Sequence, residues 1–148
     1  MGNLILFLER NRDWAPLILR VGLAVVFLLF GFQKLAHPAQ TTAEIQLLME
    51  FLNLAAAAAV NFYLGLTELA VALGLLLGIR TRFFGVLSVL LPFLFLVSFL
   101  WKLGVSINPD LYRDVGLAAA GLALVFLGGG RWSWDNRSGP TSEAKSQV

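Results

Sequence analysis

The sequence has 148 residues, of which 58% are hydrophobic and only 14% are charged, and its mean hydropathy is +0.79. An ordinary soluble domain of this size needs more polar surface, so the composition excludes that class and indicates a protein of the lipid bilayer. The formal net charge is only +2, and the basic residues are spread over flanks and loops, so we predict no nucleic-acid partner.

The elements follow one another along the chain in a simple order. Residues 1–14 combine apolar and basic residues, which predicts a short interfacial helix. Residues 16–35, 55–79, 83–103 and 111–129 are apolar runs of about 20 residues, the length that crosses a bilayer as a helix. Between the first two runs, residues 41–54 space apolar side chains at helical intervals, and we expect this helix on the outer leaflet.

The four runs are uniformly apolar, whereas strands of a membrane barrel alternate apolar and polar residues. The predicted fold is therefore all-α, an integral membrane four-helix bundle. Its domains are an interfacial segment at 1–14, the bundle at 15–135 and a flexible cytoplasmic tail at 136–148. We expect the first run to remain as a span, because it is longer than the core of a cleaved signal peptide.

Basic residues near the span ends predict the orientation. Those on one side are Arg10, Arg12, Arg20, Arg80, Arg82, Arg131, Arg137 and Lys145, against Lys34, Lys102 and Arg113 on the other. Both termini should therefore be cytoplasmic. The four Trp residues fall at predicted span ends, where indole rings favour the membrane interface.

The chain has no Cys and a single His, His37. By itself it therefore supplies no thiolate metal site, no disulfide exchange and no haem held by two histidines. We predict no haem and no metal, so any redox centre must belong to a partner.

Glu68 is the most informative polar residue. It lies about 16 Å from the cytoplasmic edge of its span, where a charged side chain costs on the order of 2.5 to 3.5 kcal/mol. Such a residue needs a partner, a proton, or water or a ligand beside it. Asn61, Gly65 and Ala72 share its helix face, so we expect Glu68 to point into the bundle. A purely structural hydrogen bond stays open as the alternative.

Other spans offer partners for this acid. Arg20 lies about 6 Å inside the first span, so a pair with Glu68 is stretched. Lys34 or Lys102 lies closer to the level of Asp114, and we expect a pair there, at the wall of an outward-facing polar vestibule with Glu68 at its floor. Alternatively, long basic side chains such as Lys102 reach the headgroups, and Asp114 favours a helix N-terminus.

Three stretches in this order resemble the DoxX family of small four-helix membrane proteins. They are "LILRVGLAVVFLLFGFQKL", "GLTELAVALGLLLGIRTR" and "YRDVGLAAAGLALVFLGGGRWSWD", and the resemblance covers about residues 15–135. It implies a bacterial or archaeal cytoplasmic-membrane protein linked to quinone-coupled oxidation, like the small subunit of a thiosulfate:quinone oxidoreductase. The family's conserved polar positions fall on Arg20, Lys34, Glu68 and Asp114. The loop "NLAAAAAV" departs from the family pattern.

Two functions follow from this resemblance and from the polar residues. In the first, the chain is a membrane subunit that binds a quinone or a similar amphipathic molecule and works with a partner oxidoreductase. Glu68 and Asp114 would then move protons, and the binding residues would be Arg20, Lys34, Phe27, Phe95, Phe99 and Lys102. In the second, it is a non-enzymatic scaffold or a small proton-coupled transporter, which would need to form a homo-oligomer. Whether the chain takes part in catalysis stays open.

Overall fold

The computed structural model describes residues 2–54, 56–104 and 109–137, and every regular element in these ranges is a helix. The elements are α1 (Gly2–Arg10), α2 (Trp14–Ala36), the 3-10 turn η1 (Pro38–Gln40), α3 (Thr42–Leu52), α4 (Ala57–Leu77), α5 (Thr81–Leu103), α6 (Pro109–Leu127) and α7 (Trp134–Arg137). The all-α prediction is confirmed for this part of the chain. The predicted tail lies outside it beyond residue 137.

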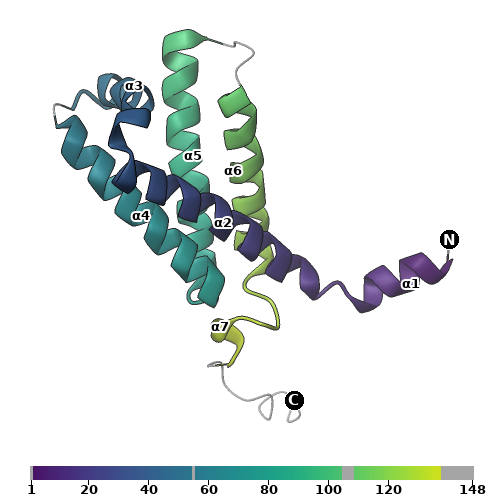
Figure 1. The fold of residues 1–148 in the computed structure, drawn as a ribbon. Helices are drawn as coiled ribbons and strands as arrows, with labels where there is room; N and C mark the ends of the chain where they lie inside the picture. The colour runs from purple at the N-terminus through teal and green to yellow at the C-terminus, as the bar shows by residue number, and fades with distance from the viewer. Residues whose placement is uncertain (1, 55, 105–108, 138–148) are drawn as a thin grey trace, which may run out of the picture.

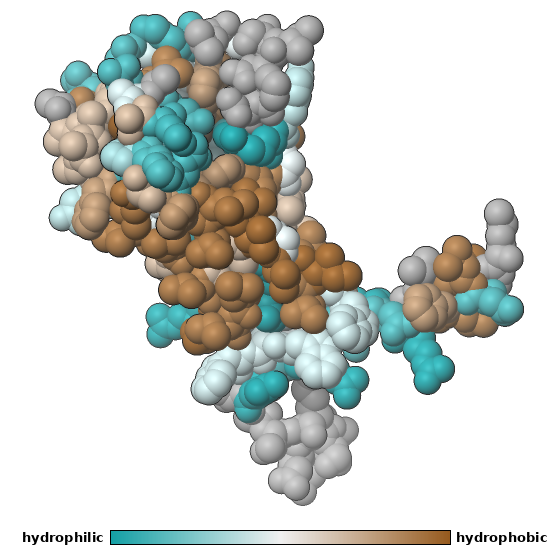
Figure 2. Space-filling model, in the orientation of Figure 1, coloured by the Kyte–Doolittle hydropathy of each residue, from teal (hydrophilic) through white to brown (hydrophobic). Residues whose placement is uncertain are grey.

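Three helices, α2, α4 and α5, are long and apolar enough to cross a membrane. They correspond to the first three predicted runs. On the face shown in Figure 2, hydrophobic side chains form a band across the middle of the molecule, with hydrophilic residues toward both ends. The fourth predicted run corresponds to α6, whose first turns carry the charges of Asp110, Arg113 and Asp114.

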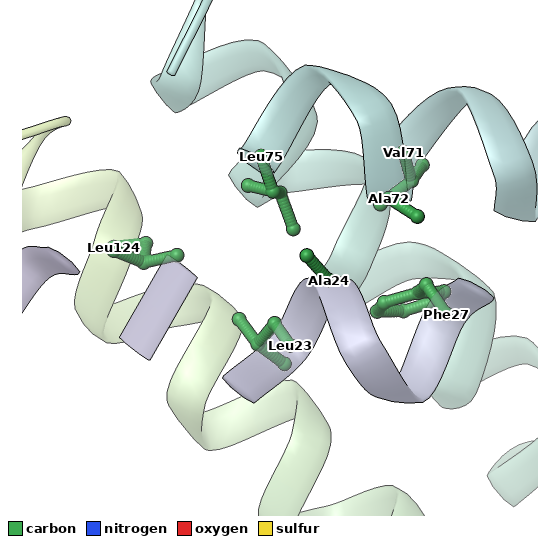
Figure 3. Packing of buried hydrophobic residues seen from close by; sticks show 7 residues of the cluster. All are labelled: Leu23, Ala24, Phe27, Val71, Ala72, Leu75 and Leu124. Atoms are coloured by element: carbon green, nitrogen blue, oxygen red, sulfur yellow. The ribbon is translucent and has the colours of Figure 1, made fainter. Parts of the chain in front are cut away.

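The long helices associate in two closely packed pairs, α2 with α4 and α5 with α6 (Figure 1). Smaller contacts of α2 with α6 and of α4 with α5 join the pairs. The central core lies where α2, α4 and α6 meet (Figure 3), and its buried members are Leu23, Ala24, Phe27, Val71, Ala72, Leu75 and Leu124. α1 projects away from the other helices, and α7 lies near the turn between α4 and α5 (Figure 1).

Small residues allow α2 and α4 to approach each other closely. A Cβ added to Gly31 of α2 would lie 2.8 Å from the carbonyl oxygen of Gly65 in α4. In a membrane such close approach supplies van der Waals packing that apolar contact with lipid cannot replace. The small-residue stripe predicted around Glu68 is therefore the surface along which α4 packs on α2.

The apolar face of α3 packs on protein. Ile45, Leu48 and Met49 are buried in a second cluster with Phe95 of α5, whereas the expected position on the outer leaflet stays a prediction. Val60 and Leu64 of α4 pack against the same cluster. The helical spacing of the apolar residues was read correctly, but amphipathic spacing does not distinguish a protein surface from a lipid surface.

The turn between α4 and α5 is held by the short helix α7. Gly78 ends α4 in the left-handed conformation, with φ +66°, which glycine adopts without steric cost. The carboxylate of Asp135 then accepts hydrogen bonds from the backbone N–H groups of Arg80 at 2.6 Å and Thr81 at 2.7 Å. Asp135 thus caps α5 from a distant part of the chain. Burial opposes ionisation, but the hydrogen bonds from Thr81 and Arg80 outweigh it and lower the pKa of Asp135.

We predict that Gly31→Ala lowers the thermal stability of the purified protein, because the new methyl group forces α2 and α4 apart. Gly22→Ala is the matched control on the same helix, since a Cβ there meets nothing within 4 Å. It should leave the melting temperature unchanged or raise it. Equal effects of the two substitutions in a melting experiment would contradict the close packing of α2 on α4.

We also predict that Asp135→Ala destabilises the protein by about 1 kcal/mol, the usual value of an N-cap. Because the folded protein lowers the pKa of Asp135, the stabilisation is present above the unfolded pKa of about 3.9. It is lost as the pH falls through the lower folded pKa. The difference in melting temperature between wild type and variant should therefore shrink below about pH 4. Asp13→Ala is the control, since the side chain of Asp13 makes no cap hydrogen bond to α2.

Candidate functional site

A buried ion pair joins the two most tightly packed helices. The ammonium Nζ of Lys34, in the last turn of α2, lies 2.9 Å from Oε1 of Glu68 in the middle of α4. The two side chains are only 4% and 3% exposed. The prediction that Glu68 points inwards is confirmed, and its partner is Lys34 rather than Arg20.

The directions of the two side chains explain this pairing. Side chains on a helix lean toward its N-terminus. Because α2 and α4 run in opposite directions, Lys34 leans from the end of α2 toward the middle, and Glu68 leans from the middle of α4 toward the same end. A Cβ added to Gly65, three residues before Glu68, would lie 3.2 Å from the Cβ of Lys34, so the two side chains bridge only about 4.5 Å along the axis. Backbone depth alone does not contain these side-chain directions and therefore did not predict the pair.

Asn61 anchors the pair from the side of the backbone. Its Nδ2 donates to the carbonyl oxygen of Lys34 at 2.9 Å, and its Oδ1 accepts from Oγ1 of Thr41, also at 2.9 Å. The carbonyl of Lys34 belongs to the last turn of α2 and has no partner within that helix. The side-chain amide of Asn61 donates a hydrogen bond to this carbonyl and so fixes the position of the Lys34 backbone.

A small cavity of about 30 Å³ lies beside the ion pair. This volume holds a water-sized group. Four long helices and α3 contribute its lining, which consists of Phe27, Phe30, Gln33, Lys34, Glu44, Glu68, Leu91, Pro92, Phe95, Arg113 and Asp114. Among the described residues, the second carboxylate oxygen of Glu68, Oε2, is buried without a hydrogen-bond partner. A buried acceptor of this kind is costly unless a water or a ligand donates to it.

Aromatic rings surround the cations at this cavity. Nζ of Lys34 lies 5.5 Å from the ring centres of both Phe30 and Phe95, and the guanidinium of Arg113 lies 4.8 Å from the centre of Phe30. Each distance is within the range of a cation–π interaction. The cavity therefore combines positive charge, a carboxylate and aromatic faces.

Asp114 reaches the same cavity but has a different partner from the one expected. Its carboxylate Oδ1 accepts from Nε of the neighbouring Arg113 at 3.1 Å, and Asp114 is buried. The expected pair of Asp114 with Lys34 or Lys102 is wrong. Lys102 instead pairs with Glu50 of α3 at 2.5 Å, with both side chains about half exposed, and neither Lys102 nor the buried Phe99 lines the cavity.

Arg20 lies at the opposite end of α2 and is 1% exposed. Its Nε donates to the carbonyl oxygen of Leu75 at 2.9 Å and its Nη1 to that of Gly129 at 2.6 Å. Nη2 donates to the carbonyl of Leu76 at 3.3 Å. Arg20 thus satisfies carbonyls at the C-terminal end of α4 and ties them to the segment after α6. Arg20 does not line the cavity, and the stretched pair with Glu68 does not form, because Glu68 pairs with Lys34.

Several lining residues were not expected from the sequence. Phe30 and Gln33 both lie on α2. Phe30 comes one helical turn before Lys34, so helical periodicity alone would have placed it on the same face as Lys34. Gln33 comes directly before Lys34. Glu44 comes from α3, whose position over the cavity depends on packing that no local pattern encodes.

Comparison with known proteins gives one match. A protein-family model described as DoxX matches residues 15–103, a range that includes α2, α3, α4 and α5 with Lys34 and Glu68. The match ends before α6, so Asp114, which the resemblance identified with the family's fourth-span Asp, lies outside the matched range. No curated protein and no solved structure matches the chain.

We predict that breaking the ion pair from one side is strongly destabilising. Lys34→Met or Glu68→Leu leaves an unpaired charge in a dry environment and should cost about 3–5 kcal/mol. The double variant Lys34→Met/Glu68→Leu should recover most of this loss, because both charges are gone and the volumes are similar. Unfolding of the purified protein in mixed micelles measures the three values.

The exposed pair of Lys102 and Glu50 provides the control for this cycle. Lys102→Met should cost only about 0.2–1 kcal/mol, as is usual for solvent-exposed pairs. A loss at Lys34 that is no larger than the loss at Lys102, or a double variant as unstable as the sum of its single variants, would contradict the structural importance of the buried pair.

Proposed function

The chain belongs to the DoxX family of membrane proteins, and on this basis we propose that it is the membrane subunit of a quinone-linked redox system. It binds the oxygen-bearing head of a quinone or a similar amphipathic molecule at the Lys34–Glu68 cavity. The observation that carries this proposal is the buried carboxylate oxygen Oε2 of Glu68, a residue of the cavity wall, which accepts no hydrogen bond from the described part of the chain.

The proposed topology has α6 as a fourth span and both termini on the cytoplasmic side of a bacterial or archaeal inner membrane. The hydrophobic band over the middle of the helices supports the span (Figure 2). The basic residues Arg80, Arg82 and Arg131 gather at the end where α4 joins α5, and the positive-inside tendency assigns this end to the cytoplasm. The cavity then lies toward the outer half of the membrane.

The residues at the cavity suit the polar end of a quinone. The ammonium of Lys34 is a donor for a carbonyl oxygen, and Glu68 can hold or pass a proton because one of its oxygens is unoccupied by protein donors. Phe27, Phe30 and Phe95 supply aromatic walls. A volume of about 30 Å³ admits an oxygen atom but not a ring, so the ring must rest outside the present cavity or displace lining side chains.

The electrons must come from a partner oxidoreductase, because the chain contains no Cys and only one His. Quinone reduction couples electron uptake to proton uptake, so the contribution of this subunit is positioning and proton handling. Asp114 lies at the same cavity and adds a second carboxylate to Glu68, and Arg113 adds a fixed positive charge.

The small cavity also supports a second function, a scaffold that holds an oxidoreductase at the membrane. In that case the buried ion pair only specifies the packing of α2 on α4. The two functions differ in whether a ligand stabilises the folded protein.

We predict that a soluble quinone analogue such as decylubiquinone raises the melting temperature of the purified protein, because a ligand that binds only the folded state stabilises it. The variant Lys34→Met/Glu68→Leu should fold but show no such rise. The exposed-pair variant Lys102→Met/Glu50→Gln should retain it. If decylubiquinone stabilises none of these proteins, and organic extracts of the wild type contain no quinone, the scaffold function replaces the proposed one.

A further inference from the structure

The end of the molecule opposite the ion pair carries a second, larger pocket. It is open, has a volume of about 750 Å³, and lies between the turn joining α4 to α5 and the glycine-rich segment after α6. Arg80, Arg82, Phe83, Leu127 and Arg131 are among its lining residues. None of these residues takes part in the Lys34–Glu68 cavity.

The pocket has an excess of positive charge that is not paired with carboxylates in the described part of the chain, although Arg131 lies 5.9 Å from the ring centre of Trp132. The guanidinium groups of Arg80, Arg82 and Arg131 form no ion pair with a carboxylate in the part of the chain that the structure describes. Two carboxylates, Asp13 and Asp135, also line the pocket. The carboxylate of Asp135 already accepts from the backbone of Arg80 and Thr81, so the balance of charge favours an anion.

The backbone at this pocket leaves room for a ligand to approach it closely. Gly128 has φ +70°, and a Cβ added to it would meet only Nε of Arg82, at 3.8 Å. Arg80 is held in the left-handed region at φ +44°, a conformation that costs energy for a residue with a side chain. The hydrogen bond from its N–H to Asp135 maintains this conformation.

Next to the charges lies an apolar wall at the expected level of the membrane surface. Phe83 and Leu127 are 57% and 54% exposed. Trp14 and Trp132 lie next to the lining residues Asp13, Arg131 and Ser133 in the sequence, with ring centres 6.0 Å apart, and both are about half exposed. Indole rings favour the interface between headgroups and acyl chains. The pocket therefore offers cations for a headgroup and an apolar surface for a chain in the same place.

We propose that this pocket binds an anionic phospholipid, with Arg82 and Arg131 at the headgroup phosphate and Phe83 and Leu127 along the first part of an acyl chain. Basic pockets between membrane helices are suited to such headgroups, and arginine matches the geometry of phosphate oxygens. The apolar wall selects a lipid over free phosphate. This proposal is independent of the quinone proposal, because the two sites share no residue.

The test is lipid retention in native mass spectrometry of protein released from nanodiscs that contain equal amounts of phosphatidylglycerol and phosphatidylcholine. The wild type should retain phosphatidylglycerol in preference to phosphatidylcholine. Arg82→Gln/Arg131→Gln should lower that preference by about 30-fold, the effect of two arginines near the surface. Both side chains are exposed, so the variant should melt like the wild type.

The matched control is Arg10→Gln/Arg12→Gln, which removes the same charge from exposed positions outside the pocket. It should leave the preference within about twofold, since a diffuse charge is largely screened by salt. An equal loss in the control variant would overturn the proposal in favour of a diffuse basic surface. If inorganic phosphate alone raises the melting temperature as much as phosphatidylglycerol does, the site binds free phosphate and the lipid assignment is wrong.

Discussion

The packing of α2 against α4 encloses a pair of charges, each of which would be costly in the membrane without the other. Lys34 and Glu68 are both almost fully buried and lie 2.9 Å apart. Each alone would be an unpaired charge in a medium of low dielectric constant, and together they are compatible with the surrounding apolar side chains. The pair is formed only when Gly31 and Gly65 let the helices approach. The close packing and the ion pair therefore stabilise each other.

The molecule separates its polar groups into two ends with different chemistry. At the end nearer α3, the buried charges of Lys34, Glu68 and Asp114 and the partly exposed Arg113 lie around a cavity of about 30 Å³. At the other end, Arg20 satisfies backbone carbonyls of α4 and of the segment after α6. The exposed arginines around the α4–α5 turn remain available to the membrane surface. One buried arginine thus holds the helix ends together, while the exposed ones face outwards.

The position of α3 links the fold to the candidate site. Its apolar face packs on Phe95, a residue that also forms part of the cavity wall. The same helix brings Glu44 to the cavity and places Glu50 beside Lys102. A displacement of α3 would therefore change both the wall and the charge of the cavity.

The sequence by itself determined the all-helical fold, the spans α2, α4 and α5, the family, and the inward direction of Glu68. The family follows from the resemblance of three sequence stretches, and the others follow from apolar length, helical periodicity and the cost of a charge in lipid, which are local properties of the chain. Only the tertiary structure decided the partners: Lys34 for Glu68, Arg113 for Asp114, Glu50 for Lys102 and backbone carbonyls for Arg20. A partner depends on the axial offset, the relative direction and the closeness of two helices. Those quantities arise from packing between distant segments, and no local pattern contains them.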